Sequence, residues 1–250
     1  MNATTASAGV LAGAKGLTRR FGGLVAVSGL DIEIRTGEIL GLIGPNGAGK
    51  STTFNLLSGF YKPSEGQLFF DGMDITGRSP TWISRRGLIR TFQHGSLMRS
   101  MTVRDNLLVG AIGGLRGRRA ERRARVDETA ELLGLTAHLD DVAGALPHGL
   151  QRLVSIGIAF APRPRLLCLD EPLTGLNQTE VHTTLDTFRA IRSRFGSSIL
   201  LVEHNMKAVM QICDRIVVLH HGQMLATGLP QDIRRDERVI SAYLGKRHDG

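Results

Sequence analysis

A phosphate-binding loop at residues 44–51 constrains the fold of this chain more than any other feature. Its sequence, Gly-Pro-Asn-Gly-Ala-Gly-Lys-Ser, fits the pattern G-x-x-x-x-G-K-[ST] at every fixed position. The apolar run at residues 39–43 predicts a buried strand before the loop, and residues 51–58 predict a helix that ends at Gly59. A loop between a strand and a helix N-terminus turns backbone N–H groups and the helix dipole toward one anion. The chain is therefore expected to bind a nucleoside triphosphate.

The loop also predicts which residues hold that nucleotide. Its glycines let successive N–H groups converge on one phosphate, while the Lys50 ammonium adds positive charge. The Ser51 hydroxyl is in addition a predicted ligand of Mg²⁺. The loop residues predicted to bind the nucleotide are Gly44, Pro45, Asn46, Gly47, Ala48, Gly49, Lys50, Ser51 and Thr52.

A pair of acids forms the second chemical landmark. Four apolar residues at 166–169 predict a buried strand, and Asp170 and Glu171 follow at its carboxyl end, the edge where open α/β sheets bind their ligands. Together with the loop, this pair predicts a nucleotide-hydrolysis site. Asp170 and Ser51 would hold Mg²⁺, and Glu171 would orient and deprotonate the attacking water. A kinase would instead need an acceptor pocket, and no pattern in the sequence indicates one.

Length and composition narrow the class of protein. With 250 residues and 42% hydrophobic content, the chain can bury the core of one large domain, with or without a subdomain. No apolar stretch approaches the roughly 18 to 20 residues that cross a bilayer, and the first residues lack a signal-peptide pattern. Cys168 and Cys213 suggest neither a disulfide framework nor a metal cluster, so both are expected to be reduced and inert. We therefore expect a cytoplasmic location.

The formal net charge of +8 raises the question of an acidic partner. Much of this charge lies in an arginine stripe at residues 116–125, ahead of a helical apolar pattern. A solvated helix face is the plainest interpretation, and contact with anionic lipid headgroups or an acidic partner is the alternative. Nucleic acid is not expected as a partner, since no interleaved aromatics or binding motif accompany the stripe. The arginines concerned are Arg116, Arg118, Arg119, Arg122, Arg123 and Arg125.

Strand and helix patterns alternate along the rest of the chain. Residues 30–34 and 68–70 predict antiparallel strands, the second followed by a turn at residues 71–72. Residues 102–138 are helix-forming throughout, and a further helix is predicted from Asn177 to Gly196. A strand at 198–202, a short helix from Asn205, a strand at 216–219 and a turn at 221–222 follow. We find no internal repeat and no linker long enough for two independent domains.

In their order, these features resemble the ATP-binding subunits of ABC transporters over nearly the whole chain. Phe21 matches the aromatic residue that stacks on adenine, and Gln93 matches the Q-loop glutamine. Residues 146–151 stand where the signature motif belongs, and residues 173–177 match the D-loop region. His204 matches the switch histidine.

The resemblance implies a role for each of these residues. His204 would donate a hydrogen bond to charge that develops on the γ-phosphate. Gln93 would contact the metal or the lytic water and would move with a neighbouring subunit. The implied catalytic residues are Glu171, His204, Gln93 and Lys50, and the implied metal ligands are Ser51, Gln93 and Asp170. The implied enzyme is an Mg²⁺-dependent ATPase with ATP and Mg²⁺ as cofactors.

The signature segment departs from the commonest family form, L-S-G-G-Q. Pro147 replaces its serine, His148 replaces a glycine, and Leu150 replaces the glutamine, although Gln151 follows. Backbone N–H groups at a helix N-terminus can still bind phosphate. The residues implied to contact the nucleotide of a partner subunit are Pro147, His148, Gly149 and Asn177. The altered segment leaves a hydrolysis-impaired regulatory subunit open as an alternative, and the apolar residues 153–161 predict a buried helix.

The implied fold is the α/β P-loop NTPase fold of ABC ATPases. It has a mainly parallel core sheet, an antiparallel β-subdomain and a helical subdomain. The expected organisation is a single domain over residues 1–250. Residues 9–93 and 162–227 would form the core with the β-subdomain, residues 94–161 the helical subdomain, and residues 228–250 a C-terminal tail.

Several segments most resemble the ATPases of branched-chain and other hydrophobic amino acid importers, and the tail at residues 239–245 does so most clearly. The chain resembles the longer of the two ATPases in such systems. The implied partners are a second ATPase subunit in a head-to-tail pair, two membrane permeases and, indirectly, a substrate-binding protein. The chain would then lie on the inner face of the membrane, bound to the permeases. A urea or amide importer and an exporter are alternatives, because the substrate is set by other subunits. An ABC ATPase of DNA repair or translation is a further alternative, although one cassette of 250 residues has no room for the long insertion or the second cassette of those types.

Overall fold

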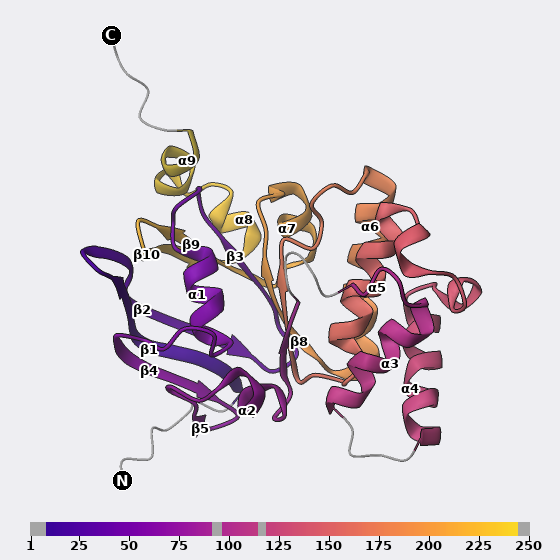
Figure 1. Cartoon of the computed structure of the whole chain (residues 1–250). Helices are drawn as coiled ribbons and strands as arrows, with labels where there is room; N and C mark the ends of the chain where they lie inside the picture. The colour runs from indigo at the N-terminus through magenta and orange to yellow at the C-terminus, as the bar shows by residue number, and fades with distance from the viewer. Residues whose placement is uncertain (1–8, 92–96, 115–118, 245–250) are drawn as a thin grey trace. The chain divides into compact units, whose positions relative to one another are not determined.

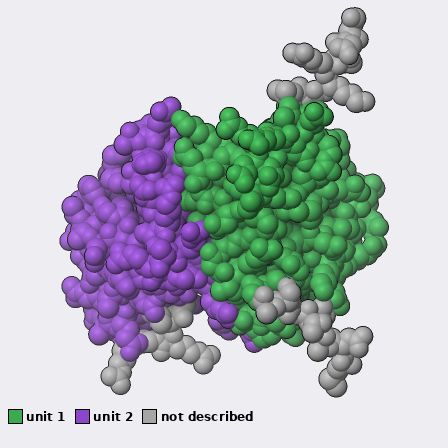
Figure 2. Space-filling model, turned by 180° about the vertical axis from the view of Figure 1, so that it is seen from behind, with its two compact units in different colours: residues 1–83, 200–250 green, residues 84–199 purple. Residues whose placement is uncertain are grey.

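A computed structural model describes residues 9–91, 97–114 and 119–244 of the chain. The chain divides into two compact units, residues 1–83 with 200–250 and residues 84–199, which Figure 2 shows in green and purple. We call them the loop unit and the helical unit. The chain passes from one unit to the other after Ile83 and again inside strand β8 (Ser198–Val202), which is buried along its whole length.

The phosphate-binding loop follows a strand of a six-stranded, mainly parallel sheet. In the loop unit, strands of this sheet have the order β10-β9-β3, with β3 (Ile39–Ile43) parallel to β9 (Arg215–His220) and β10 (Gln223–Gly228) antiparallel to β9. All five residues of β3 are buried, as the apolar run predicts. Helix α1 (Lys50–Leu57) follows the loop, and α7 (Met206–Ile212), α8 (Pro230–Ile233) and α9 (Glu237–Leu244) complete the C-terminal part.

A second, antiparallel sheet belongs to the same unit. Its order is β2-β1-β4-β5, formed by β1 (Val10–Phe21), β2 (Leu24–Arg35), β4 (Glu65–Phe70) and β5 (Met73–Asp74). The predicted turn at Asp71-Gly72 joins β4 to β5, since Phe70 pairs with Met73 across it. Gly13 in β1 permits a close approach of the strands, because an added Cβ would lie 2.2 Å from the Ile32 carbonyl oxygen. The short helix α2 (Pro80–Ser84) follows this sheet.

The helical unit joins two parallel strands to a group of helices. Strands β6 (Leu88–Arg90) and β7 (Leu166–Asp170) pair in parallel. Between them in sequence come α3 (Val103–Gly114), α4 (Arg119–Leu132), the 3₁₀ turns η1 (Thr136–His138) and η2 (Ala143–Ala145), and α5 (His148–Phe160). The long helix α6 (Gln178–Phe195) follows β7, and α3, α4, α5 and α6 pack beside one another (Figure 1).

A partly buried arginine contacts three of these helices. The Arg163 guanidinium lies 4.4 Å from the ring centre of Phe160 on α5 and 3.7 Å from that of Phe195 on α6. It also forms an ion pair with Glu128 of α4. Burial lowers the pKa of Arg163, and the Glu128 carboxylate partly opposes that shift. Stacking on two aromatic rings and pairing with an acid together offset the desolvation of this cation.

The secondary structure confirms the main sequence predictions. The helix from Asn177 ends at Gly196, a left-handed C-cap, and the turn at His221-Gly222 joins β9 to β10. Helix α5 buries Leu153 and most of its apolar residues, as predicted. In the described part of the arginine stripe, Arg119 and Arg123 are exposed on α4, whereas Val126 is buried. This arrangement is that of a solvated helix face. Arg116 and Arg118 lie outside the described residues. None of the described helices is long and apolar enough to span a membrane.

Candidate functional site

The phosphate-binding loop has the backbone shape that its glycines predict. Gly44, Gly47 and Gly49 have φ values of 152°, 77° and 100°, a region that other residues rarely adopt. Gly49 is the N-cap of α1 and supplies no side-chain cap. The first-turn N–H groups of this helix are thus oriented for an anion, as a phosphate site requires.

Lys50 closes over the loop. Its Nζ donates to the Gly44 carbonyl oxygen at 2.7 Å and to the Pro45 carbonyl oxygen at 3.0 Å. The side chain is buried, whereas Ser51 is exposed at the start of the helix. The ammonium therefore already lies at the loop, and the Ser51 hydroxyl is accessible to a metal ion.

The turn between β9 and β10 supports the loop from one side. The Gly222 N–H donates to the Ala48 carbonyl oxygen at 3.0 Å, and the Ser28 N–H donates to the Gly222 carbonyl oxygen at 2.8 Å. An added Cβ on Gly49 would lie 2.7 Å from the carbonyl oxygen of Ala26 in β2. Strand β2, the hairpin turn and the loop thus form one close-packed backbone layer.

The C-terminal helix reaches the same loop, which sequence reasoning missed. Burial raises the pKa of Tyr243 in α9, and a hydrogen bond with the Gly44 backbone partly opposes that shift. The buried Val239 anchors α9 in the loop unit. The two bonded residues lie almost 200 positions apart, so no local pattern predicts this contact.

Phe21 ends β1 and belongs to an exposed aromatic group. Its ring packs edge-on against Tyr61, with centroids 5.3 Å apart, and the Arg19 guanidinium lies 4.5 Å from its centroid. Arg19 also donates to the Lys62 carbonyl oxygen at 2.8 Å. Phe21 is 38% exposed, so a planar base can reach its ring. The neighbours Arg19 and Tyr61 were not predicted from sequence.

His204 follows β8 and has an exposed side chain beside a fully buried acid. Its side chain is 60% exposed, and its Nδ1 lies 4.0 Å from Oε2 of Glu203, whose side chain is 0% exposed. The same Glu203 oxygen accepts from the His204 N–H at 3.1 Å. Glu203 therefore fixes the backbone from which the imidazole projects.

Asp170 and Glu171 stand at the end of β7 in the helical unit. Asp170 is buried, and its N–H donates to the Thr91 hydroxyl at 3.2 Å. Thr91 in turn donates its N–H to the Cys168 carbonyl oxygen at 2.9 Å. Bonds to the segment after β6 therefore hold the acidic edge in place. Gln93, which follows that segment, lies outside the described residues.

Glu171 has an uncommon backbone conformation. Its φ is 47°, in the left-handed region that glycine favours. Its carbonyl oxygen accepts from the Thr174 N–H at 3.3 Å and from Nη2 of Arg152 at 3.0 Å. Sequence reasoning missed Arg152, because its partner is a main-chain atom on a distant segment.

The signature segment packs against the start of α6. An added Cβ on Gly149 would lie 2.3 Å from the Glu180 carboxylate, and one on Gly175 would lie 3.0 Å from the His148 ring. Pro147 is the N-cap of α5 and makes no side-chain cap bond. Nε2 of Gln151 donates to the Leu146 carbonyl oxygen at 2.7 Å. The start of α5 therefore has no side-chain cap from its N-cap residue.

Asn177 has a structural role that its position at a helix start explains. Its side-chain oxygen accepts from the Glu180 N–H at 3.0 Å, and the Glu180 carboxylate accepts from the Asn177 N–H at 2.9 Å. These two bonds form a capping box at the start of α6. The contact of Asn177 with a partner's nucleotide stays a prediction.

Comparison with known proteins identifies the family. Residues 27–174, from β2 past the acidic edge, match the ABC transporter family. The chain belongs to the ABC transporter ATP-binding family. As an ABC ATPase, it is the ATP-hydrolysing type of subunit that the loop and the acidic pair predict. A second match, over residues 223–249, is to the branched-chain amino acid ATP-binding cassette transporter family.

Relatives of this ABC ATPase extend over nearly its whole length. It is 44% identical over 245 residues to the high-affinity branched-chain amino acid transport ATP-binding protein LivG of Salmonella typhimurium, covering 92% of this chain and 96% of LivG. It is 42% identical to BraF of Pseudomonas aeruginosa, with the same coverage. The ADP conformation of an ABC transporter cassette superposes with a TM-score of 0.85 at 29% identity, covering 95% of this chain and 99% of that one. These likenesses confirm the predicted family and fold class.

The donors suit Mg²⁺ in the ABC ATPase. This ion usually binds through one or two protein oxygens, with phosphates and waters as its other ligands. Ser51 supplies an exposed hydroxyl and Asp170 a carboxylate. The described residues contain no cluster of three His, Cys, Asp or Glu that could hold a metal. A metal held by either donor would need phosphate or water oxygens to complete its coordination.

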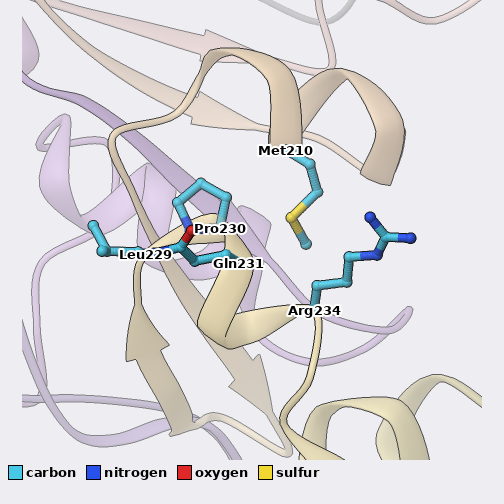
Figure 3. Close-up of a pocket in the computed structure, with 5 residues that line it drawn as sticks. All are labelled: Met210, Leu229, Pro230, Gln231 and Arg234. Carbon is cyan, nitrogen blue, oxygen red and sulfur yellow. The ribbon is translucent and has the colours of Figure 1, made fainter.

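A further hollow in the loop unit lies beside α7 and α8 (Figure 3). Met210, Leu229 and Pro230 give it apolar walls, while Gln231 and Arg234 bring polar groups. None of the nucleotide-binding residues predicted for the ABC ATPase lines it.

Proposed function

We propose that this ABC ATPase powers the import of branched-chain or other hydrophobic amino acids. The observation that carries the proposal is the match of residues 223–249 to the branched-chain amino acid transporter family. It agrees with the relatives LivG and BraF, whose names assign them to branched-chain amino acid transport. The tail is informative because the phosphate-binding loop and acidic edge are shared by ABC ATPases of every substrate class.

In the proposed chemistry, ATP binds with its phosphates on the loop at residues 44–52. Lys50 and the α1 N–H groups neutralise phosphate charge, and Phe21 stacks on adenine. Glu171 accepts a proton from the attacking water. His204 donates a hydrogen bond to the γ-phosphate as charge develops there. The exposed His204 side chain and the accessible Phe21 ring support these two roles.

Mg²⁺ completes the proposed site. Ser51, Asp170 and Gln93 would hold it, and the bound ion would neutralise charge on the phosphates during transfer. The exposed hydroxyl of Ser51 and the position of Asp170, whose backbone N–H bonds to Thr91 at the end of β7, support this assignment. Gln93 rests on the family resemblance alone.

The proposed assembly places this subunit on the cytoplasmic face of the membrane. A second ATPase subunit pairs with it head-to-tail, so that Pro147, His148, Gly149 and Asn177 contact the partner's nucleotide. Two permeases span the membrane, and a binding protein delivers the substrate from outside. The uncapped start of α5 supports the phosphate contact in trans.

Reconstitution tests the transport proposal. The chain would be co-purified with the permeases and second ATPase encoded beside it, placed in vesicles with ATP, and supplied with the neighbouring binding protein. We expect ATP-dependent uptake of labelled leucine, isoleucine or valine. Vesicles that contain the Glu171→Gln subunit are the matched control.

Other substrates would revise the proposal in a defined way. Uptake of urea or amides without uptake of branched-chain amino acids would contradict the proposed substrate but keep the import function. ATP-dependent movement out of the cytoplasmic compartment, from an operon without a binding protein, would indicate an exporter. Neither result would affect the ATPase assignment.

A further inference from the structure

Arg152 connects the signature helix to the backbone of Glu171. It lies near the start of α5, and its Nη2 donates to the Glu171 carbonyl oxygen at 3.0 Å, across 19 residues of sequence. Both residues belong to the helical unit, and both are partly buried. The bond therefore joins two segments to which the proposed function gives different tasks.

Glu171 differs from the other residues with positive φ. Four described non-glycine residues have this backbone shape. Asp71 and His221 occupy the first positions of two-residue hairpin turns, which favour left-handed residues. Arg163 follows α5 and is held between two aromatic rings. Glu171 lies at the end of a strand, and among the described residues neither a hairpin turn nor a pair of aromatic rings like those around Arg163 accounts for its backbone shape. Such backbone outliers are frequent at functional sites.

The Glu171 carbonyl oxygen receives two donors from different directions. The Thr174 N–H closes the local turn at 3.3 Å, and the Arg152 guanidinium reaches it from α5. Charged donors form stronger hydrogen bonds than neutral ones. The direction of the Cα–Cβ bond depends on the backbone torsions, so fixing this peptide also fixes where the carboxylate points.

We propose that Arg152 is a positioning residue for ATP hydrolysis, which holds the backbone of Glu171 and so aims its carboxylate at the attacking water. The inference rests on the proposed function, in which Glu171 is the general base. It adds a link along α5, whose first residues, His148 and Gly149, are the proposed contacts with the partner's nucleotide. A movement of α5 when it contacts the partner's nucleotide would change the hydrogen bond from Arg152 to the Glu171 carbonyl oxygen.

Two substitutions separate positioning from simple packing. Arg152→Met keeps an unbranched stem and removes the donors, while Arg152→Lys restores one charged donor. The purified full-length variants would be compared in kcat, KM for ATP, affinity for a fluorescent ATP analogue, thermal midpoint, and the amount of ATP-induced dimer on size exclusion.

Two further variants are controls. Glu171→Gln gives the phenotype of a lost base. Arg189→Ala removes an exposed arginine of α6 that pairs with Asp186.

We expect Arg152→Met to lower kcat at least tenfold, because small displacements of a catalytic group are costly. ATP affinity should stay within about twofold of the wild type. The ATP-bound dimer should accumulate as in Glu171→Gln, Arg152→Lys should recover part of kcat, and Arg189→Ala should match the wild type.

Wild-type kcat in Arg152→Met would overturn the inference. So would a fall in kcat that merely follows an equal loss of ATP affinity or a lowered thermal midpoint, since Arg152 would then only stabilise α5. A different result marks failure of the proposed function. If Glu171→Gln turns over ATP normally, Glu171 is not the base, and the role of Arg152 fails with it.

Discussion

At the scale of single residues, we expect Lys50 and Glu171 to have separable tasks. Lys50 lies on the loop, bonded to the Gly44 and Pro45 carbonyl oxygens, where it can exchange these acceptors for phosphate oxygens. Glu171 stands on another segment, with its backbone held in a left-handed conformation. Nucleotide binding should therefore depend on one residue and turnover on the other.

Substituting the two residues tests this division. Glu171→Gln should lower kcat by about 10²- to 10⁴-fold, the usual contribution of a general base, and should leave ATP affinity near the wild-type value. Lys50→Ala should instead weaken ATP binding. ATPase rates and equilibrium nucleotide binding measure the two effects. Near-normal turnover in Glu171→Gln would remove it from the role of base.

The two cysteines offer a second residue-scale test. Burial raises the pKa of the Cys168 thiol to about 12, and burial also raises the pKa of Cys213, helped by nearby acids. Since the thiolate is the reactive form, neither side chain should react with iodoacetamide at pH 8 in the folded protein.

Mass spectrometry after alkylation would measure this protection. Alkylation in denaturant is the control, and both sites should then be modified. Rapid labelling of either cysteine in the native protein would show that its strand or helix opens in solution.

At the scale of elements, continuous apolar strands were the most predictable part of the fold. Strands β3, β7 and β8 are buried at every position, and their sequences are apolar apart from Asp170 at the end of β7 and Ser198 at the start of β8. Strand β1 was missed. Its first half is rich in small residues, and it has several register shifts against β2, which obscure the alternation that marks a strand.

In the candidate site, residues that are contiguous in sequence could be predicted, whereas residues that contact remote segments could not. The loop at residues 44–52 and the acidic pair are contiguous in sequence, and spacing alone predicts them. Arg152 and Tyr243 act through main-chain atoms of remote segments, Glu171 and Gly44. A main-chain hydrogen-bonding group places no demand on residue type, so no pattern around it indicates the partner.

Helix α6 provides an element-scale prediction. Asn177→Ala removes the capping box at its start and should cost about 1 kcal/mol of unfolding free energy, the usual value of a lost N-cap. Denaturant unfolding of the full chain measures this loss. Gln178→Ala, at the next and exposed position, is the matched control and should be nearly neutral.

The same variant separates the cap from the proposed contact with the partner's nucleotide. If Asn177 serves only α6, turnover per folded subunit should be unchanged. A loss of ATP-induced dimer at full stability would instead favour the contact in trans.

At the scale of the whole molecule, hydrolysis should depend on protein concentration. In the proposed head-to-tail pair, the signature segment of one subunit completes the site of the other. Turnover per subunit should then rise with concentration, or on addition of the second ATPase. A dilution series with sedimentation analysis measures both quantities. Turnover that stays flat across the series, with no dimer at any concentration, would contradict the pairing.

Coupling to the permeases is the second prediction at this scale. We expect a cytoplasmic permease helix to dock beside Gln93 and Arg104, which lies at the start of α3 and pairs with Asp127 and Asp140. We expect ATP-driven closure to move that region as a rigid body. Gln93→Ala should reduce transport and permease-stimulated hydrolysis more than basal hydrolysis. Vesicle assays of both rates make the comparison. An equal fall in both hydrolysis rates, with substrate moved per ATP unchanged, would assign Gln93 to the chemistry alone.

The bond between Tyr243 and the Gly44 backbone has a consequence for how such proteins diversify. Residues 27–174 and residues 223–249 match two separate family models. Yet the tail helix bonds to the first glycine of the loop. A tail exchanged between related cassettes would bring a new neighbour to the nucleotide, so recombination in this lineage should preserve the tail tyrosine wherever it preserves the loop.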